Sequence, residues 1–178
     1  DTLASAGILL LGTIVAYAMV MSNSDWFYSF VDGNLAGSRT PAASTESLRA
    51  TLYDNEDQSG LGVFATFLFS HNSRVAIFAF ALGFAFCIPT VAYMLMTGLM
   101  LGGFIGLFAS KGLGWEAGGW LIIHGSTEIF AIILAGAGGL FIGRAVAFPG
   151  DLSRRASAAK AGQMAGLLMA GVIVMLFC

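Results

Sequence analysis

Charged residues are scarce in this sequence of 178 residues, because only 10% of it is Asp, Glu, Lys or Arg while 57% is hydrophobic. A soluble domain carries about 25% charge. The scarcity therefore argues against a soluble fold and predicts a chain that exposes apolar side chains to a lipid bilayer. The formal net charge is only −2, so long-range attraction to nucleic acid is weak and we expect no nucleic-acid partner.

Proline and cysteine are also rare, with three and two residues. Cys87 and Cys178 both lie in apolar stretches, which argues against a disulfide framework and favours free thiols among packed helices. The 24 glycines are typical of closely packed transmembrane helices. The chain begins with Asp1 instead of Met and ends inside an apolar run, so we expect a fragment of a longer polypeptide.

Long uncharged stretches predict an all-α fold, a polytopic transmembrane helical bundle that forms a single domain over residues 1–178. About 20 apolar residues cross the hydrocarbon layer as a helix. We predict about five spans, at residues 3–21, 74–88, 91–109, 120–143 and 161–178. Pro89 separates the second span from the third, because proline disfavours helix at and before its position. Both are short, so a re-entrant pair over 75–109 is the alternative.

The region before the second span is harder to assign. Residues 61–69 are apolar but too few to cross a bilayer, and the polar residues 70–74 follow. We therefore predict an interfacial helix, or half of a broken helix, near 61–73. Residues 22–60 read as a polar loop, in which Ser44 can cap a short helix that carries Leu48 and Leu52 on one face.

Basic residues set the expected orientation. Residues 144–160 contain four of them with a single acid, Asp151. Loops that are rich in Lys and Arg stay in the cytoplasm. We therefore expect 144–160 to be a cytoplasmic loop, and counting spans back makes 22–60 an extracytoplasmic loop.

Small residues recur every four positions on three of the predicted spans, which places them on one helix face. Such faces let two helix backbones approach closely, either within one subunit or in a homo-oligomer. We favour this interpretation over a conduction path or a hinge. The glycines concerned are Gly98, Gly102, Gly106, Gly139, Gly143, Gly162 and Gly166.

Two ionisable residues, His124 and Glu128, lie inside the fourth span. They are one helical turn apart and share a face, and a carboxylate in hydrocarbon needs a partner or a cavity. The spacing suits two ligands of one metal ion, but a zinc site needs a third ligand that no motif supplies. We favour a buried polar network, keep His124 and Glu128 only as weak metal candidates, and expect no cofactor.

Partners for Glu128 are available before the second span. Arg74 and the pair His71 and Asn72 should lie on the same side of the membrane as His124. We hypothesise that Arg74 or His71 neutralises Glu128 across a helix interface. In the alternative interpretation, Arg74 extends to the lipid headgroups.

Three segments resemble the stage II sporulation protein M family of prokaryotic membrane proteins. They are Phe67-Leu-Phe-Ser-His-Asn-Ser-Arg-Val75, Met96-Thr-Gly-Leu-Met-Leu-Gly102, and His124-Gly-Ser-Thr-Glu-Ile-Phe-Ala131 followed by Ala135-Gly-Ala-Gly-Gly139. The likeness covers roughly residues 60–178, and Thr97 stands where the family usually has Asn, which makes Thr97 a further candidate for a polar role.

The resemblance implies a multi-pass protein of the prokaryotic plasma (inner) membrane. The sporulating member works with two peptidoglycan-degrading partners, the stage II sporulation proteins D and P, and some relatives are encoded near MoxR-type ATPases. For this chain it implies envelope or peptidoglycan-remodelling proteins, or a MoxR-type ATPase, as partners beside the lipid bilayer.

Three functions follow as hypotheses. The first is a non-enzymatic scaffold or assembly factor, since the sequence shows small-residue helix faces and no catalytic set. The second is a transporter or channel that uses the buried His124 and Glu128 pair. An intramembrane metalloenzyme is a distant third.

Overall fold

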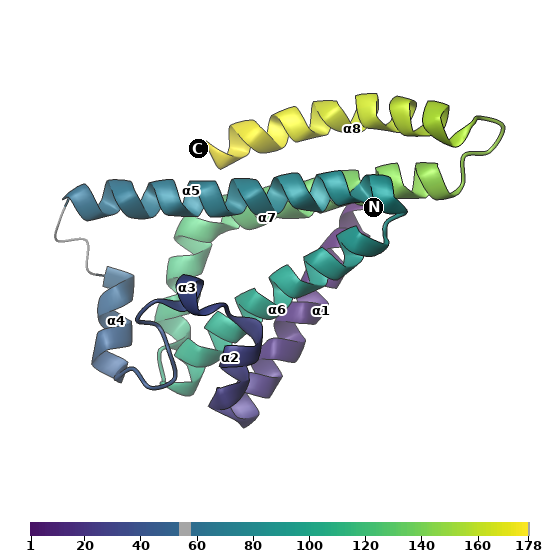
Figure 1. Cartoon of the computed structure of the whole chain (residues 1–178). Coiled ribbons are helices and arrows are strands. Elements are labelled where there is room, and N and C mark those ends of the chain that lie inside the picture. The colour runs from purple at the N-terminus through teal and green to yellow at the C-terminus, as the bar shows by residue number, and fades with distance from the viewer. Residues whose placement is uncertain (54–57, 178) are drawn as a thin grey trace. The chain divides into compact units, whose positions relative to one another are not determined.

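The computed structural model describes residues 1–53 and 58–177, with side chains for all of these except residues 58–68 and 124. This part of the chain is helical and contains no strand (Figure 1), which confirms the all-α prediction. The elements in order are α1 (Thr2–Ser22), η1 (Ser24–Trp26), α2 (Phe27–Phe30), α3 (Gly33–Ala36), α4 (Thr45–Tyr53), α5 (Gln58–Ala81), η2 (Leu82–Ala85), α6 (Ile88–Ser110), α7 (Gly114–Ala147) and α8 (Arg154–Leu176).

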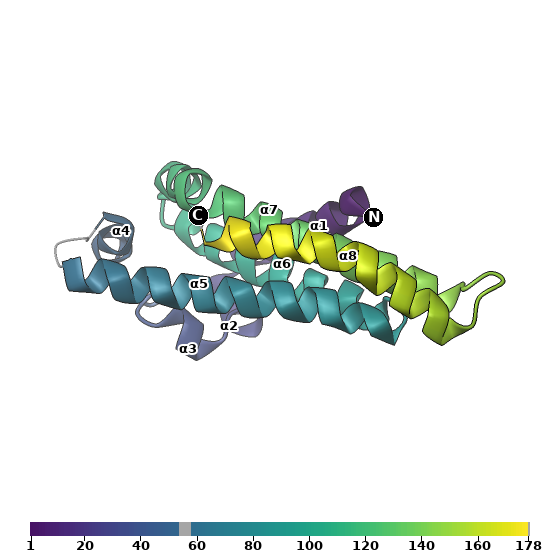
Figure 2. The ribbon, with the colours of Figure 1, turned by 90° about the horizontal axis from the view of Figure 1, so that it is seen from above.

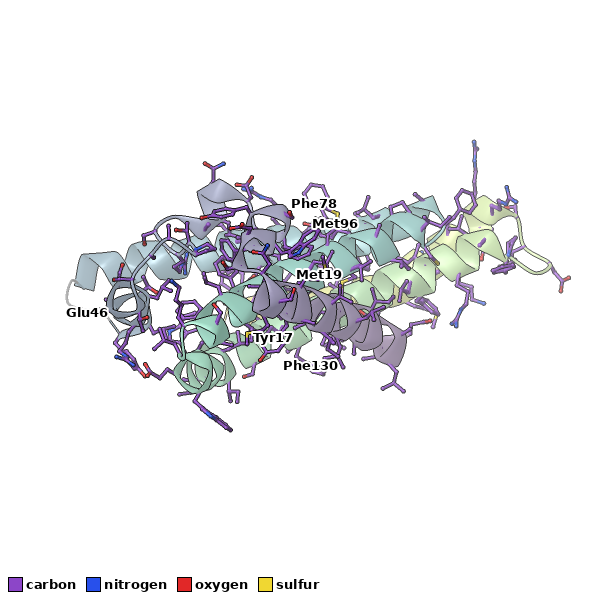
Figure 3. The ribbon with its side chains drawn as sticks, turned by 90° about the horizontal axis from the view of Figure 1, so that it is seen from below. Tyr17, Met19, Glu46, Phe78, Met96 and Phe130 are labelled. Carbon is purple, nitrogen blue, oxygen red and sulfur yellow. The ribbon has the colours of Figure 1, made fainter. Side chains whose placement is uncertain are left out.

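Four helices in the described part of the chain are long and apolar enough to cross a membrane. They are α1, α6, the Gly125–Ala147 portion of α7, and α8. The prediction of spans in these four places is therefore confirmed, although α7 begins at Gly114 and α8 at Arg154, earlier than expected. Large side chains such as Tyr17 on α1 and Phe130 on α7 are exposed (Figure 3), as lipid-facing positions require.

The region before α6 differs from the prediction. Helix α5 runs without interruption through residues 70–74 and ends at Ala81, so the break that we expected near 61–73 does not occur there, nor does a helix over 74–88. The polar residues are accommodated in the helix, because Ser70 and Arg74 are exposed, the three residues between them are half-buried, and Asn72 has a hydrogen-bond partner. The chain breaks instead at residues 82–87, where Phe86 and Cys87 adopt positive φ angles of 66° and 67°.

Pro89 lies in the first turn of α6, where its missing N–H costs no helical hydrogen bond. From there α6 continues to Ser110, a length that matches a complete crossing and not half of a re-entrant pair. It ends in a glycine-capped turn: Gly112 has φ +77°, and the amide of Leu113 donates to the carbonyl of Phe108 at 2.9 Å. This pairing satisfies a terminal carbonyl of the helix.

The chain divides into two compact units, and the division falls inside α1, α5, α6 and α7. One unit comprises Leu9–Phe64 and Leu95–Ser126. Here residues 23–53, which we call the cap, pack on the end of α6 and the start of α7 around the buried side chains of Phe27, Val31, Ala36, Leu48, Leu52, Leu107, Phe108 and Leu113. The amide of Ser47 donates to the Ser44 hydroxyl at 3.1 Å at the start of α4, which confirms the predicted cap of this helix.

The other unit comprises Asp1–Ile8, Ala65–Met94 and Thr127–Cys178. In it, α5, α7 and α8 run alongside one another (Figures 1 and 2). Small side chains form the seams between them, because Ala76, Ala131 and Ala135 share one buried cluster with Met169 and Val172 of α8. Helix α7 is the innermost of the three over this stretch, and the α8 face opposite this cluster is exposed.

Candidate functional site

The strongest candidate site is a polar contact between α5 and α7. The side-chain amide of Asn72 donates a hydrogen bond to Oε2 of Glu128 at 2.6 Å, and both residues are half-buried. A hydrogen bond to a carboxylate is about twice as strong as one between neutral groups. The contact therefore holds an acidic side chain at an interface between two apolar helices, where an unpartnered carboxylate would be costly.

The two helices approach closely because glycines line their seam. Gly139 of α7 lies against the backbone of Gly83 and against the carbonyl oxygen of Ala79. One turn later, Gly143 lies against the backbone and side chain of Cys87. A Cβ on Gly139 would overlap the Ala79 oxygen, one on Gly83 would overlap the Gly139 backbone, and one on Gly143 would overlap Cys87, so these glycines permit the close approach of α7 to α5 and to the turn that follows it.

Buried hydroxyl groups add to the same unit. The hydroxyl of Thr90 donates to the carbonyl of Ala79 at 3.1 Å, and the hydroxyl of Ser5 donates to the carbonyl of Ile133 at 2.8 Å. Both side chains are fully buried. Sequence reasoning did not single out either residue, since a lone Ser or Thr in an apolar helix carries no signal of its tertiary partner.

The other predicted site residues fall in several places. Arg74 is exposed on α5 and His71 is half-buried beside Asn72. Thr97 is half-buried on α6, in the unit that contains the cap. The backbone of His124 belongs to α7, and its side chain lies outside the described residues. We expected Arg74 or His71 to pair with Glu128, and the structure instead shows a hydrogen bond to Glu128 from Asn72, their neighbour on α5.

The part of the chain that the structure describes contains no set of side chains that could ligate a metal ion. No three His, Cys, Asp or Glu side chains there lie close enough to hold one ion. The Asn72 and Glu128 pair supplies an amide and a carboxylate, which can hold or pass a proton or bind a polar solute.

The remaining glycine faces differ from one another. Gly98 and Gly102 of α6 lie against the backbone of α1 at Leu9 and Thr13, and a Cβ on Gly106 would meet Val20 at 3.0 Å. On α8, a Cβ on Gly162 would make an ordinary contact with Phe84 at 3.5 Å, whereas Gly166 has no described atom within 4 Å. Helix α8 instead packs through a face that includes Ser157, Ala161 and Ala165.

Charged groups in the cap also escaped sequence reasoning. Arg49 of α4 makes a two-armed ion pair with Glu116 of α7, with N–O distances of 3.0 Å, and this carboxylate raises the pKa of Arg49. Arg39 donates to the carbonyls of Leu35 and Ala36, and its guanidinium lies 5.5 Å from the centre of the Phe104 ring. Burial lowers the pKa of Arg39.

Comparison with known proteins gives one match. The model of the family described as stage II sporulation protein M matches residues 5–178, which is nearly the whole chain and includes both the cap and the Asn72 and Glu128 contact. No curated protein and no solved structure matches the chain.

Proposed function

This chain belongs to the stage II sporulation protein M family, and we propose that it acts as a non-enzymatic scaffold in the prokaryotic plasma membrane, where it assembles envelope or peptidoglycan-remodelling proteins. The observation that carries the proposal is the folded cap. Residues 23–53 bury Phe27, Val31 and Leu48 against the ends of two membrane helices. A polar segment with its own core offers a partner a fixed surface, which a disordered loop would not.

Contacts outside this core also hold the cap in place. Besides the pair between Arg49 and Glu116, the ammonium group of Lys111 donates to the carbonyl of Ala43 at 3.1 Å. These contacts join the segment after α1 to the connection between α6 and α7 and to the first turn of α7. They support a topology in which both segments lie on the extracytoplasmic side, as the basic loop at 144–160 also requires.

The arrangement of α5 supports a fifth crossing. The pairs Asn72 with Glu128 and Ala79 with Gly139 run in the same direction along α5 and α7. The ring of Phe69, the first α5 side chain that the structure describes, lies 4.6 Å from that of Phe177, which follows the last residue of α8. A helix that lies alongside two candidate spans over this length is better placed to cross the bilayer than to lie along its surface.

Partners other than lipid belong to the same proposal. The open glycine face at Gly166 on α8 supports a homo-oligomer, because such faces allow helix backbones of two subunits to approach. Envelope proteins would bind the cap, and a MoxR-type ATPase would approach from the cytoplasmic side.

Site-specific photocrosslinking in cells tests the scaffold proposal. A photoreactive residue replaces Glu46, which is exposed in the first turn of α4 (Figure 3), or Asp151, which is exposed between α7 and α8. We expect peptidoglycan-remodelling or other envelope proteins among the products at position 46 and not at position 151. The Leu48→Asp change, which disrupts the cap core, should remove these products while the protein still inserts. Identical products at both positions would refute the proposal.

A transporter or channel is the second candidate, and the half-buried Glu128 favours it. Polar residues inside a membrane often mark a path for ions or protons. Flux into proteoliposomes that is lost in Glu128→Gln, a change that preserves shape and removes charge, would favour transport. A protein that shows no flux but requires Glu128 for stability would favour the scaffold. Metal analysis of the purified protein tests the metalloenzyme hypothesis.

A further inference from the structure

The connection between α7 and α8 lies at the depth of lipid headgroups in any orientation of the protein. One candidate span ends at Ala147 and the next begins at Arg154, so residues 148–153 lie between two adjacent membrane crossings. The turn at residues 82–87 immediately precedes the span of α6. Arg154 links the two connections, because its guanidinium lies 5.6 Å from the centre of the Phe86 ring.

This end of the unit carries positive charge that the protein leaves unbalanced. Arg154 and Arg155 are the first residues of α8, where the helix dipole disfavours cations, and the first turn contains no acid. Over the described residues, no carboxylate lies within ion-pair distance of Arg154, Arg155 or Lys160. Arg144 differs, because it pairs with the carboxylate of Asp1 at 3.1 Å.

Large apolar side chains surround these charges and are exposed. Phe148 is 81% exposed, Leu152 is 46% exposed and Phe86 is 47% exposed. A partner that covers both kinds of group must combine an anion with hydrocarbon. A protein or a soluble anion that bound at headgroup depth would cover only the cations. Phe148 and Leu152 would then still face lipid.

We propose that these residues form a binding site for an anionic phospholipid of the surrounding bilayer. In this site Arg154 and Arg155 donate hydrogen bonds to the lipid phosphate, Lys160 adds long-range attraction, and acyl chains cover Phe148 and Leu152. Basic side chains at the membrane boundary recognise anionic headgroups in this way. The proposal is independent of the scaffold function, because it concerns the connection between α7 and α8 and the turn at residues 82–87, whereas the scaffold function rests on the cap.

Native mass spectrometry of the purified full chain in detergent tests the site, with phosphatidylglycerol and phosphatidylcholine of identical acyl chains as probes. We expect the wild type to bind the anionic lipid more tightly, and added salt to weaken that binding. A basic residue near an anionic lipid strengthens binding roughly fivefold, so Arg154→Gln with Arg155→Gln should weaken phosphatidylglycerol binding about 25-fold. Binding of phosphatidylcholine should not change.

The charge-preserving pair Arg154→Lys with Arg155→Lys is the matched control, and it should keep a clear preference for phosphatidylglycerol. Both double variants change only Arg154 and Arg155, which are exposed on α8, so folding is expected to be unaffected. Equal binding of the two lipids by the wild type would overturn the proposal. So would an unchanged preference in the glutamine variant, or displacement of the lipid by an equal concentration of inorganic phosphate.

Discussion

Substitution of Gly139 by alanine tests whether close backbone contact holds α5 and α7 together. An added Cβ would overlap the carbonyl oxygen of Ala79 and would lie 3.1 Å from both Oγ1 and Cγ2 of Thr90. The obstructing oxygen belongs to the backbone of α5, so no rotation of a side chain removes the overlap. The two helices must therefore separate, and the hydrogen bond from Thr90 to Ala79 must lengthen.

The expected cost follows from three contributions. Overpacking of a well-packed interior costs about 1–3 kcal/mol, and loss of one hydrogen bond costs about 1 kcal/mol. Alanine is a better helix former than glycine by about 1 kcal/mol, which offsets part of this. Gly139→Ala should therefore lower the free energy of unfolding by about 1–3 kcal/mol.

The measurement is unfolding in mixed micelles by increasing sodium dodecyl sulfate, followed by circular dichroism. Gly7→Ala is the matched control, because Gly7 also lies inside a helix and no described atom approaches its added Cβ within 4 Å. The control should be as stable as the wild type or slightly more stable. If Gly139→Ala unfolds at the same point as Gly7→Ala, close packing of α5 on α7 does not stabilise the protein.

Two further predictions use the same unfolding assay, and a third uses limited proteolysis. Phe86→Gly should stabilise the protein by about 0.5–1 kcal/mol, because glycine adopts φ +66° without the cost that a bulky residue incurs. This gain should exceed the loss of the contact between Phe86 and Arg154. A loss of stability would refute this account of the turn. Thr90→Val should cost about 1 kcal/mol, since it leaves the Ala79 carbonyl without its donor, and an unchanged stability would contradict that. Ser44→Ala should loosen α4 by about 1 kcal/mol, seen as faster proteolysis within the cap, and equal cleavage rates would count against the capping role.

Sequence patterns were sufficient where the signal is local. A strongly apolar run of helix length predicts a crossing, because lipid offers no partner for a backbone amide, and α1, α6, α7 and α8 all contain such runs. The helix start at Ser44 is equally local, because the hydroxyl and the amide that it caps are three residues apart. The start of α6 lies within three residues of the predicted one, since proline acts on its own turn, although the break before it lies at 82–87, inside the expected second span.

Errors arose where a remote contact decides the conformation. The polar residues 70–74 suggested an interruption, yet α5 continues through them because Asn72 meets Glu128, 56 positions away in the sequence. Similarly, Gly139 and Gly166 belong to equivalent motifs, and only the first lies against another helix of the described chain. A repeat of small residues shows that a face permits close approach, and it carries no information about what approaches it.

Hydrophobicity alone therefore determined that this is a membrane protein with several helices long and apolar enough to cross a bilayer, because the free energy of placing each segment in lipid depends on that segment by itself. Which polar side chain meets Glu128, which glycine face is occupied, and that residues 23–53 fold into a cap were decided only by tertiary structure. Each of these depends on atoms that distant parts of the chain bring within contact distance, and a hydrogen bond or a close backbone approach exists only when both partners are in place.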